Sequence, residues 1–166
     1  MVYLDYSATT PVNKEVLTSF NKVIEEYPGN ANSLHKLGMK SKHLMEASSK
    51  QIANLLNVLP EEIIFTSGAS EANNLAILGT VLKYKSRGHH IITTNLEHSS
   101  VSSAIKYLEK QGYTIDYVNI LENGKIDIND LKNKLTDETV LVSISQVNSE
   151  IGIIQEVNEI GLILKD

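Results

Sequence analysis

The residues whose types and spacing could bind a ligand lie between positions 63 and 74. A short apolar run there gives way to Ser67, Gly68 and Ser70, and then to a helical pattern. This order predicts a strand, a tight turn and the start of a helix. The first N–H groups of a helix lack intrahelical partners and lie at the positive end of the helix dipole. The turn is therefore a candidate anion site, and phosphate is the expected anion.

Two familiar phosphate-binding loops are excluded at this turn. No Lys-Ser or Lys-Thr pair follows Gly68, as a P-loop requires, and there is no G-x-G-x-x-G pattern. The same residues also fit a well-capped helix that binds nothing. The rest of the chain has to decide between these alternatives.

Polar residues also follow the other predicted strands. The polar groups at strand ends are residues 67–70, residues 97–99, Asn119 and Asn148. In an open parallel sheet, ligands bind beyond the carboxyl ends of the strands. We therefore expect at least three of these four groups to meet in one crevice.

Apolar spacing predicts the elements that would position these groups. Strands are expected at residues 63–66, 90–94, 113–118 and 139–145, and helices at residues 11–27, 33–57, 70–85, 99–111, 127–135 and from 158 onward. Thr10, Ser33 and Asp127 are the expected N-caps of three of the helices. The alternation predicts an α/β fold with a partial doubly wound, mostly parallel sheet and flanking helices.

The last predicted strand, residues 139–145, is rich in β-branched residues and long enough for a central position in the sheet. The final helix has no C-cap glycine, and one sheet edge is expected to need cover. These features predict one half of a larger structure.

Composition narrows the function classes. The chain has 166 residues, 42% of them hydrophobic, and a net charge of -5 without a basic stripe, so one folded domain is expected and nucleic acid is not an expected partner. The absence of cysteine excludes disulfides, thiolate metal sites and thiol chemistry from this chain. His35 and His43 lack a third ligand nearby, so no metal site is expected. No signal peptide and no long apolar run are present, so we expect a cytoplasmic protein without membrane contact.

Taken together, five segments resemble the N-terminal part of the cysteine desulfurases, in the class V aminotransferase group of fold type I pyridoxal phosphate enzymes. They are residues 3–11, 29–35, 64–74, 97–98 and 147–155. The resemblance implies that residues 1–166 form the N-terminal segment and the first part of the large domain of such an enzyme, with the remainder and the small domain absent.

The resemblance also implies roles for particular residues. Ala69 and Ser70 match the pair that holds the cofactor phosphate, with Ser70 where the family usually has threonine. His98 matches the histidine that stacks on the pyridine ring and moves protons, and Asn148 matches the asparagine that contacts the cofactor's phenolic oxygen and the substrate carboxylate. Ala8 resembles a position near the substrate. From the residues alone, His98 also fits a helix cap and Asn148 a turn.

In the family, the lysine that binds the cofactor and the cysteine that accepts sulfur lie beyond Asp166. The resemblance therefore implies a pyridoxal phosphate site with L-cysteine as substrate, a sulfur acceptor or scaffold protein as partner, and a homodimer or association with a C-terminal half. By itself the chain is expected to be inactive and to hold the cofactor weakly. The alternatives are a non-catalytic split or truncated module acting by association, and part of a selenocysteine lyase or another class V transferase.

Overall fold

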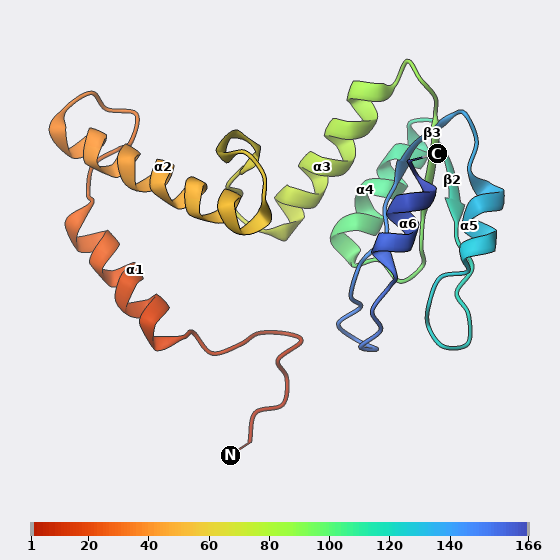
Figure 1. Cartoon of the computed structure of the whole chain (residues 1–166), viewed down its shortest axis with the longest axis horizontal. Helices are drawn as coiled ribbons and strands as arrows, with labels where there is room; N and C mark the ends of the chain where they lie inside the picture. Colours follow the sequence, from red (N-terminus) through yellow and green to blue (C-terminus); the bar gives the residue numbers. More distant parts are fainter. Residues whose placement is uncertain (1, 166) are drawn as a thin grey trace. The chain divides into compact units, whose positions relative to one another are not determined.

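The computed structural model describes residues 2–165, which divide into two compact units, Met1–Phe65 and Thr66–Asp166. Figure 1 traces the helices and strands along the chain. The first unit contains helices and connecting segments only, while the second contains the sheet.

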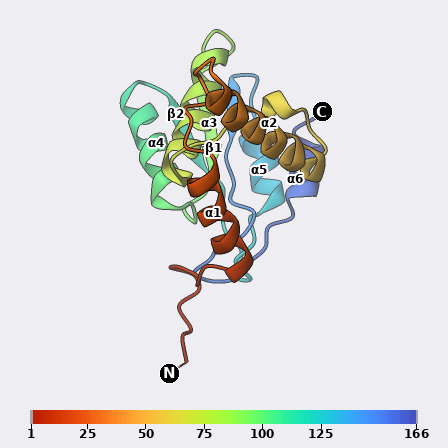
Figure 2. The same cartoon turned by 90° about the vertical axis from the view of Figure 1, so that its left-hand side faces the viewer.

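The first unit consists of α1 (Lys14–Glu26), α2 (Lys36–Leu56) and the short 3-10 helix η1 (Pro60–Glu62). Residues 2–13 contain a turn but no helix or strand, and they lead into α1 in Figure 2. No residue of α1 is buried. The apolar side chains that the sequence places on one side of this helix, such as Val16, Phe20 and Ile24, are therefore exposed. Among the described residues of this unit, Ala53 is the one buried hydrophobic side chain.

Both long helices of this unit begin later than the sequence predicts. Asn13, rather than Thr10, caps α1 by accepting hydrogen bonds from the N–H groups of the helix start. His35, rather than Ser33, caps α2 through Nδ1. Ser33 instead donates its N–H to Asn30 in a turn before the helix. The predicted N-caps Thr10 and Ser33 were therefore wrong, because the chain still runs in turns or extended conformation at those positions.

The predicted strand at residues 63–66 does not form. The chain is extended at Ile63, but no strand among residues 2–165 pairs with this segment. Ile64 and Phe65 are 68% and 55% exposed. The apolar pattern was real, but a strand also needs a hydrogen-bonded neighbour, which the described chain does not supply.

The second unit has a three-stranded parallel sheet formed by β1 (His90–Thr93), β2 (Thr114–Tyr117) and β3 (Thr139–Val142). The strand order is β2-β1-β3. The predicted α/β fold with a parallel sheet is thus confirmed. Of the described strands, β1 has two neighbours, whereas β3, whose composition suits a central position, lies at an edge of the described sheet.

Helices cover both faces of this sheet (Figure 1). They are α3 (Ala69–Tyr84), α4 (Ser99–Lys110), α5 (Ile128–Lys134) and α6 (Val157–Ile163). Ile91 of β1 belongs to a cluster with buried residues of α3 and α4, whereas Ile92 belongs to a cluster with residues of α5 and α6. Successive side chains of a strand point to opposite faces, so the sheet is a central layer between two helical layers.

His90 links the three strands at the amino end of the sheet. Its buried ring lies 2.8 Å from the Thr139 hydroxyl on β3 and 3.2 Å from the Asp116 carboxylate on β2. Because the strands are parallel, their carboxyl ends all lie together at the other end of the sheet, opposite His90. The loops that carry His98 and Asn148 begin there.

Candidate functional site

Two loops meet at the carboxyl ends of β1 and β3. Oε1 of Glu97, after β1, accepts hydrogen bonds from the Ser145 N–H at 2.7 Å and the Thr94 hydroxyl at 3.1 Å. The Asn148 side-chain amide, after β3, donates to the carbonyl of Leu96 at 3.0 Å. The two loops enclose an open pocket of about 310 Å³. Residues 95–99 and residues 145 and 147–151 line it.

Asn148 has most of its hydrogen-bonding capacity engaged by the fold. Its Oδ1 accepts from the N–H groups of Glu150 and Ile151, at 2.9 and 3.1 Å. This is the turn-forming role that the residue type also suggested. The amide nitrogen carries two hydrogens and one is bonded to Leu96. One N–H of Asn148 is therefore left for a ligand in the pocket.

His98 is the N-cap of α4. Its Nδ1 accepts from the Ser100 backbone N–H at 3.2 Å and lies 2.9 Å from the Ser100 hydroxyl. The residue is exposed and lines the pocket. No group among residues 2–165 forms a hydrogen bond with Nε2. The ring thus caps a helix through one nitrogen and leaves the other nitrogen accessible.

Ala69 and Ser70 form the first turn of α3. The N-cap is Gly68, which has no side chain to satisfy the helix start. No oxygen among residues 2–165 accepts a hydrogen bond from the N–H groups of Ala69 and Ser70, and the Ser70 hydroxyl has no partner there either. Two free N–H groups and a hydroxyl at a helix N-terminus match the chemistry of a phosphate ligand.

A carboxylate lies in the same turn of α3. Glu71 accepts from the N–H and the hydroxyl of Ser67, at 2.6 and 2.7 Å. These two hydrogen bonds lower the pKa of Glu71 from its ordinary value. The same two hydrogen bonds hold the turn before the helix in shape.

One hydrogen bond joins the start of α3 to the start of α4. The Asn73 side-chain amide donates to the buried Ser100 hydroxyl at 2.8 Å. Asn73 lies one helical turn after Ala69 and Ser70, and Ser100 contacts His98. The pair thus connects the turn that could hold an anion with the histidine of the pocket.

The prediction that at least three of the four polar groups meet in one crevice was wrong. Residues 97–99 and Asn148 line the pocket, whereas residues 67–70 and Asn119 do not, and residues 67–70 do not follow a strand of the described chain. His98 and Asn148 line one pocket, and residues 67–70 are linked to it through Asn73 and Ser100. Asn119 does not line the pocket, and its backbone N–H donates instead to Asp130 at 2.7 Å. Ala8 lies in a turn of the first unit and donates its N–H to Asp5.

Sequence reasoning gave no role to Asn73 and Ser100, which organise the site, and it named Glu97 only as part of the polar group at residues 97–99. Partial burial of Glu97 raises its pKa, and its hydrogen bonds with Ser145 and Thr94 oppose the rise. The position of Glu97 beside His98 was visible in the sequence. That it reaches the loop after β3 was not, because that contact spans almost fifty positions of the chain.

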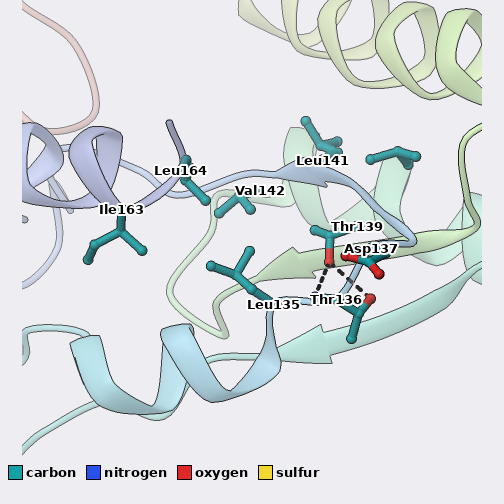
Figure 3. Close-up of a pocket in the computed structure, with 9 residues that line it drawn as sticks. Leu135, Thr136, Asp137, Thr139, Leu141, Val142, Ile163 and Leu164 are labelled. Carbon is teal, nitrogen blue, oxygen red and sulfur yellow. Dashed lines mark hydrogen bonds between the residues drawn. The ribbon is translucent and has the colours of Figure 1, made fainter. Parts of the chain in front are cut away.

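A second cavity, of about 450 Å³, lies along the edge of β3 that is free of a strand neighbour among residues 2–165 (Figure 3). Its walls are mainly apolar side chains of β3, of α6 and of the segment between α5 and β3. The hydroxyls of Thr136 and Thr139 bond to each other there, at 3.3 Å. This cavity is larger than the pocket at His98, but it contains none of the predicted site residues.

The structure also bears on two other features, a metal site and a membrane-spanning helix. Within residues 2–165, no group of three or more His, Asp or Glu side chains is placed to hold a metal ion. In that part of the chain, every helix is too short or too polar to cross a membrane.

Comparison of the sequence with known proteins identifies the family of this chain. The family described as "Aminotransferase class-V" matches residues 2–166. Cysteine desulfurase IscS of Colwellia psychrerythraea is 46% identical over 163 residues, which are 96% of this chain and 40% of the relative. Cysteine desulfurase IscS of Neisseria meningitidis is 43% identical over 166 residues, or 99% of this chain and 41% of the relative. The chain thus spans about two fifths of the length of these relatives.

Solved structures agree with this result. A "NifS-like protein" superposes with a TM-score of 0.92 at 35% identity, over 96% of this chain and 44% of that one. The structure "SspA in complex with cysteine" superposes with a TM-score of 0.91 at 34% identity. The match covers 98% of this chain and 47% of that one. Since the family match covers nearly the whole sequence, the chain belongs to the class V aminotransferase family.

Proposed function

We propose that this chain carries part of the pyridoxal phosphate site of a cysteine desulfurase. The observation that carries the proposal is the open start of α3, whose free N–H groups are linked through Asn73 and Ser100 to the pocket of His98 and Asn148. Membership of a family that uses pyridoxal phosphate supports it. In this reading, residues 1–166 are the N-terminal segment and the first part of the large domain.

Each residue of the site has a proposed task. The N–H groups of Ala69 and Ser70, with the Ser70 hydroxyl, hold the phosphate. The imidazole of His98 would face the cofactor and would hold or release a proton at Nε2. The remaining N–H of Asn148 donates to the phenolic oxygen or to the substrate carboxylate, which an amide can do without titrating. Ala8 lies near the substrate in this proposal.

Pyridoxal phosphate, when bound, supplies the electron sink for chemistry at the amino acid. The proposed substrate is L-cysteine, and one structural relative is titled as a complex with cysteine. The proposed reaction converts L-cysteine and an acceptor thiol into L-alanine and an acceptor persulfide, so that one sulfur atom changes carrier. A sulfur-acceptor or scaffold protein in the cytoplasm would receive it for iron–sulfur cluster assembly or thiolation.

The phosphate site is best tested with a ligand that cannot form a covalent bond with lysine. Pyridoxamine 5'-phosphate has no aldehyde, and pyridoxamine differs from it only by lacking the phosphate. We would titrate both into the ¹⁵N-labelled chain at millimolar concentrations and follow backbone amide shifts. We expect residues 68–71 and His98 to shift with pyridoxamine 5'-phosphate. Pyridoxamine should leave Ala69 and Ser70 unshifted. Equal shifts with both ligands, or shifts away from α3, would contradict the phosphate site.

A second experiment tests how the activity is divided. The chain contains no cysteine to accept sulfur. We therefore propose that the purified chain produces neither sulfide nor alanine when pyridoxal phosphate and L-cysteine are added. Turnover at an ordinary enzymatic rate would contradict this part of the proposal.

A different function is favoured by the free edge of β3 and the apolar cavity beside it (Figure 3). Unpaired strand edges are surfaces for association. In this second proposal the chain is a non-catalytic module that pairs with a second copy or with a separate C-terminal half. Light scattering tests self-association, and a single monomeric species at high concentration would count against it.

A further inference from the structure

We infer that Ser100 and Asn73 are positioning residues that fix the tautomer and orientation of His98. The inference rests on the proposed function to the extent that His98 faces the cofactor. The claim about the ring itself rests only on contacts within Thr66–Asp166.

The first step concerns Nδ1 of His98. The Ser100 backbone N–H points at this atom from 3.2 Å. A backbone N–H can only donate, so this contact favours the ring form in which Nδ1 accepts and carries no proton. In the neutral ring the proton is then on Nε2.

The second step concerns the direction of the chain of hydrogen bonds. The Asn73 amide nitrogen donates to the Ser100 oxygen at 2.8 Å. The Ser100 hydroxyl therefore has its own hydrogen free to donate to Nδ1 of His98, 2.9 Å away. The order of donation is Asn73 to Ser100 to His98. Since Ser100 is only 8% exposed, water does not readily replace either bond.

The third step separates this arrangement from a simple helix cap. A cap needs one acceptor for an N–H group at the start of α4, and His98 Nδ1 meets that need by accepting from the Ser100 backbone N–H. The Asn73 amide comes from α3 and donates to the Ser100 hydroxyl, which in turn contacts the ring. The imidazole is therefore held directly by α4 and, through Ser100, by α3, with Nε2–H left as the atom that can meet a ligand.

The test measures the tautomer directly. Long-range ¹H–¹⁵N correlation spectra of the chain without ligand report which ring nitrogen of His98 carries the proton. We expect wild-type His98 to be almost entirely the Nε2–H form. Asn73→Asp replaces the donor by an acceptor that takes the Ser100 hydroxyl hydrogen away from the ring. The Nδ1–H population should then rise several-fold.

Matched variants keep the result interpretable. Asn74→Asp makes the same charge change one position later, where the amide donates to the Ser70 carbonyl, and it should leave the tautomer unchanged. Ser100→Ala should raise the Nδ1–H population, whereas Ser100→Thr keeps a hydroxyl and should restore the wild-type ratio. Ser103→Ala removes an exposed hydroxyl of the same helix and serves as the control for Ser100→Ala.

The outcomes distinguish this inference from the proposed function. A wild-type tautomer ratio in folded Asn73→Asp and Ser100→Ala would overturn the inference. If Ser100→Ala does not fold, Ser100→Thr and Asn73→Asp still decide it. Failure of pyridoxamine 5'-phosphate to shift His98 would contradict the proposed function. A changed tautomer in the variants would support the inference in either case.

Discussion

The helices α3 and α4 satisfy their N-termini in opposite ways. At α3, the N-cap is a glycine, and the N–H groups of Ala69 and Ser70 have no acceptor among residues 2–165. At α4, the His98 ring accepts from the Ser100 N–H. The two helix starts are joined by one hydrogen bond between Asn73 and Ser100.

The difference indicates a division of roles. An open helix start keeps donors and positive dipole potential available for an anion. A closed start uses the same kind of donor to hold a side chain in place. In this chain the open start fits the proposed phosphate site, and the closed start orients the proposed proton-transfer residue. The following changes test that division, in order of decreasing expected effect.

Ala69→Pro should weaken binding of pyridoxamine 5'-phosphate about ten-fold or more, because it removes one N–H that would bond to a charged group. Proline is well tolerated at the first position of a helix, and Gly68 before it is extended, so α3 should persist. The titration of backbone amide shifts measures the affinity, and thermal unfolding checks the fold. Unchanged affinity would show that this N–H does not face the ligand.

His98→Ala should lower the free energy of unfolding by about 1 kcal/mol, since α4 loses its cap. His98→Asp should recover most of this loss, because aspartate is a good N-cap. Ser70→Ala, at the open start of α3, should change the free energy of unfolding by less than about 0.5 kcal/mol. Denaturant unfolding measures all three. An equal loss in Ser70→Ala and His98→Ala would remove the distinction between the two helix starts.

Glu71→Gln should strengthen binding of pyridoxamine 5'-phosphate about two-fold at low salt, because a negative charge leaves the neighbourhood of the anion. The gain should disappear as salt is added, since the carboxylate is exposed. A titration at two salt concentrations measures this. Equal gains at both concentrations would speak against an electrostatic cause.

The smallest expected effect is on the pH dependence of stability. The pKa of Glu71 is lowered, so its contribution is present above the ordinary value of 4.5 and is lost as the pH falls through the folded-state value. The pKa of Glu97 is raised, so its contribution is present below 4.5 and is lost as the pH rises through the folded-state value. Glu71→Gln and Glu97→Gln should therefore change the slope of stability against pH in opposite directions. Denaturant unfolding from pH 3 to about pH 7 measures both slopes, and slopes that change in the same direction would contradict the assignment.

Local patterns predicted most elements of the second unit well. Asp127 caps α5 as expected. Predictions failed where a distant neighbour decides the outcome. Residues 63–66 have the apolar character of a strand but no partner strand among residues 2–165, and β3 has the composition of a central strand but lies at an edge of the described sheet.

The candidate site shows the same limit. The types of Ser70, His98 and Asn148 were readable from the sequence, as was their position at element ends. Asn73 and Ser100 were not recognisable as a pair, because they are 27 positions apart and come together only when α3 packs on α4.

The sequence by itself determined the family, the α/β class and the helix start with free N–H groups, because each depends on local order along the chain. Only the tertiary structure decided which nitrogen of His98 stays accessible and how Asn148 and Glu97 join the two loops. Those features depend on hydrogen bonds between segments that the sheet brings together, and such bonds leave no periodic signal in the sequence.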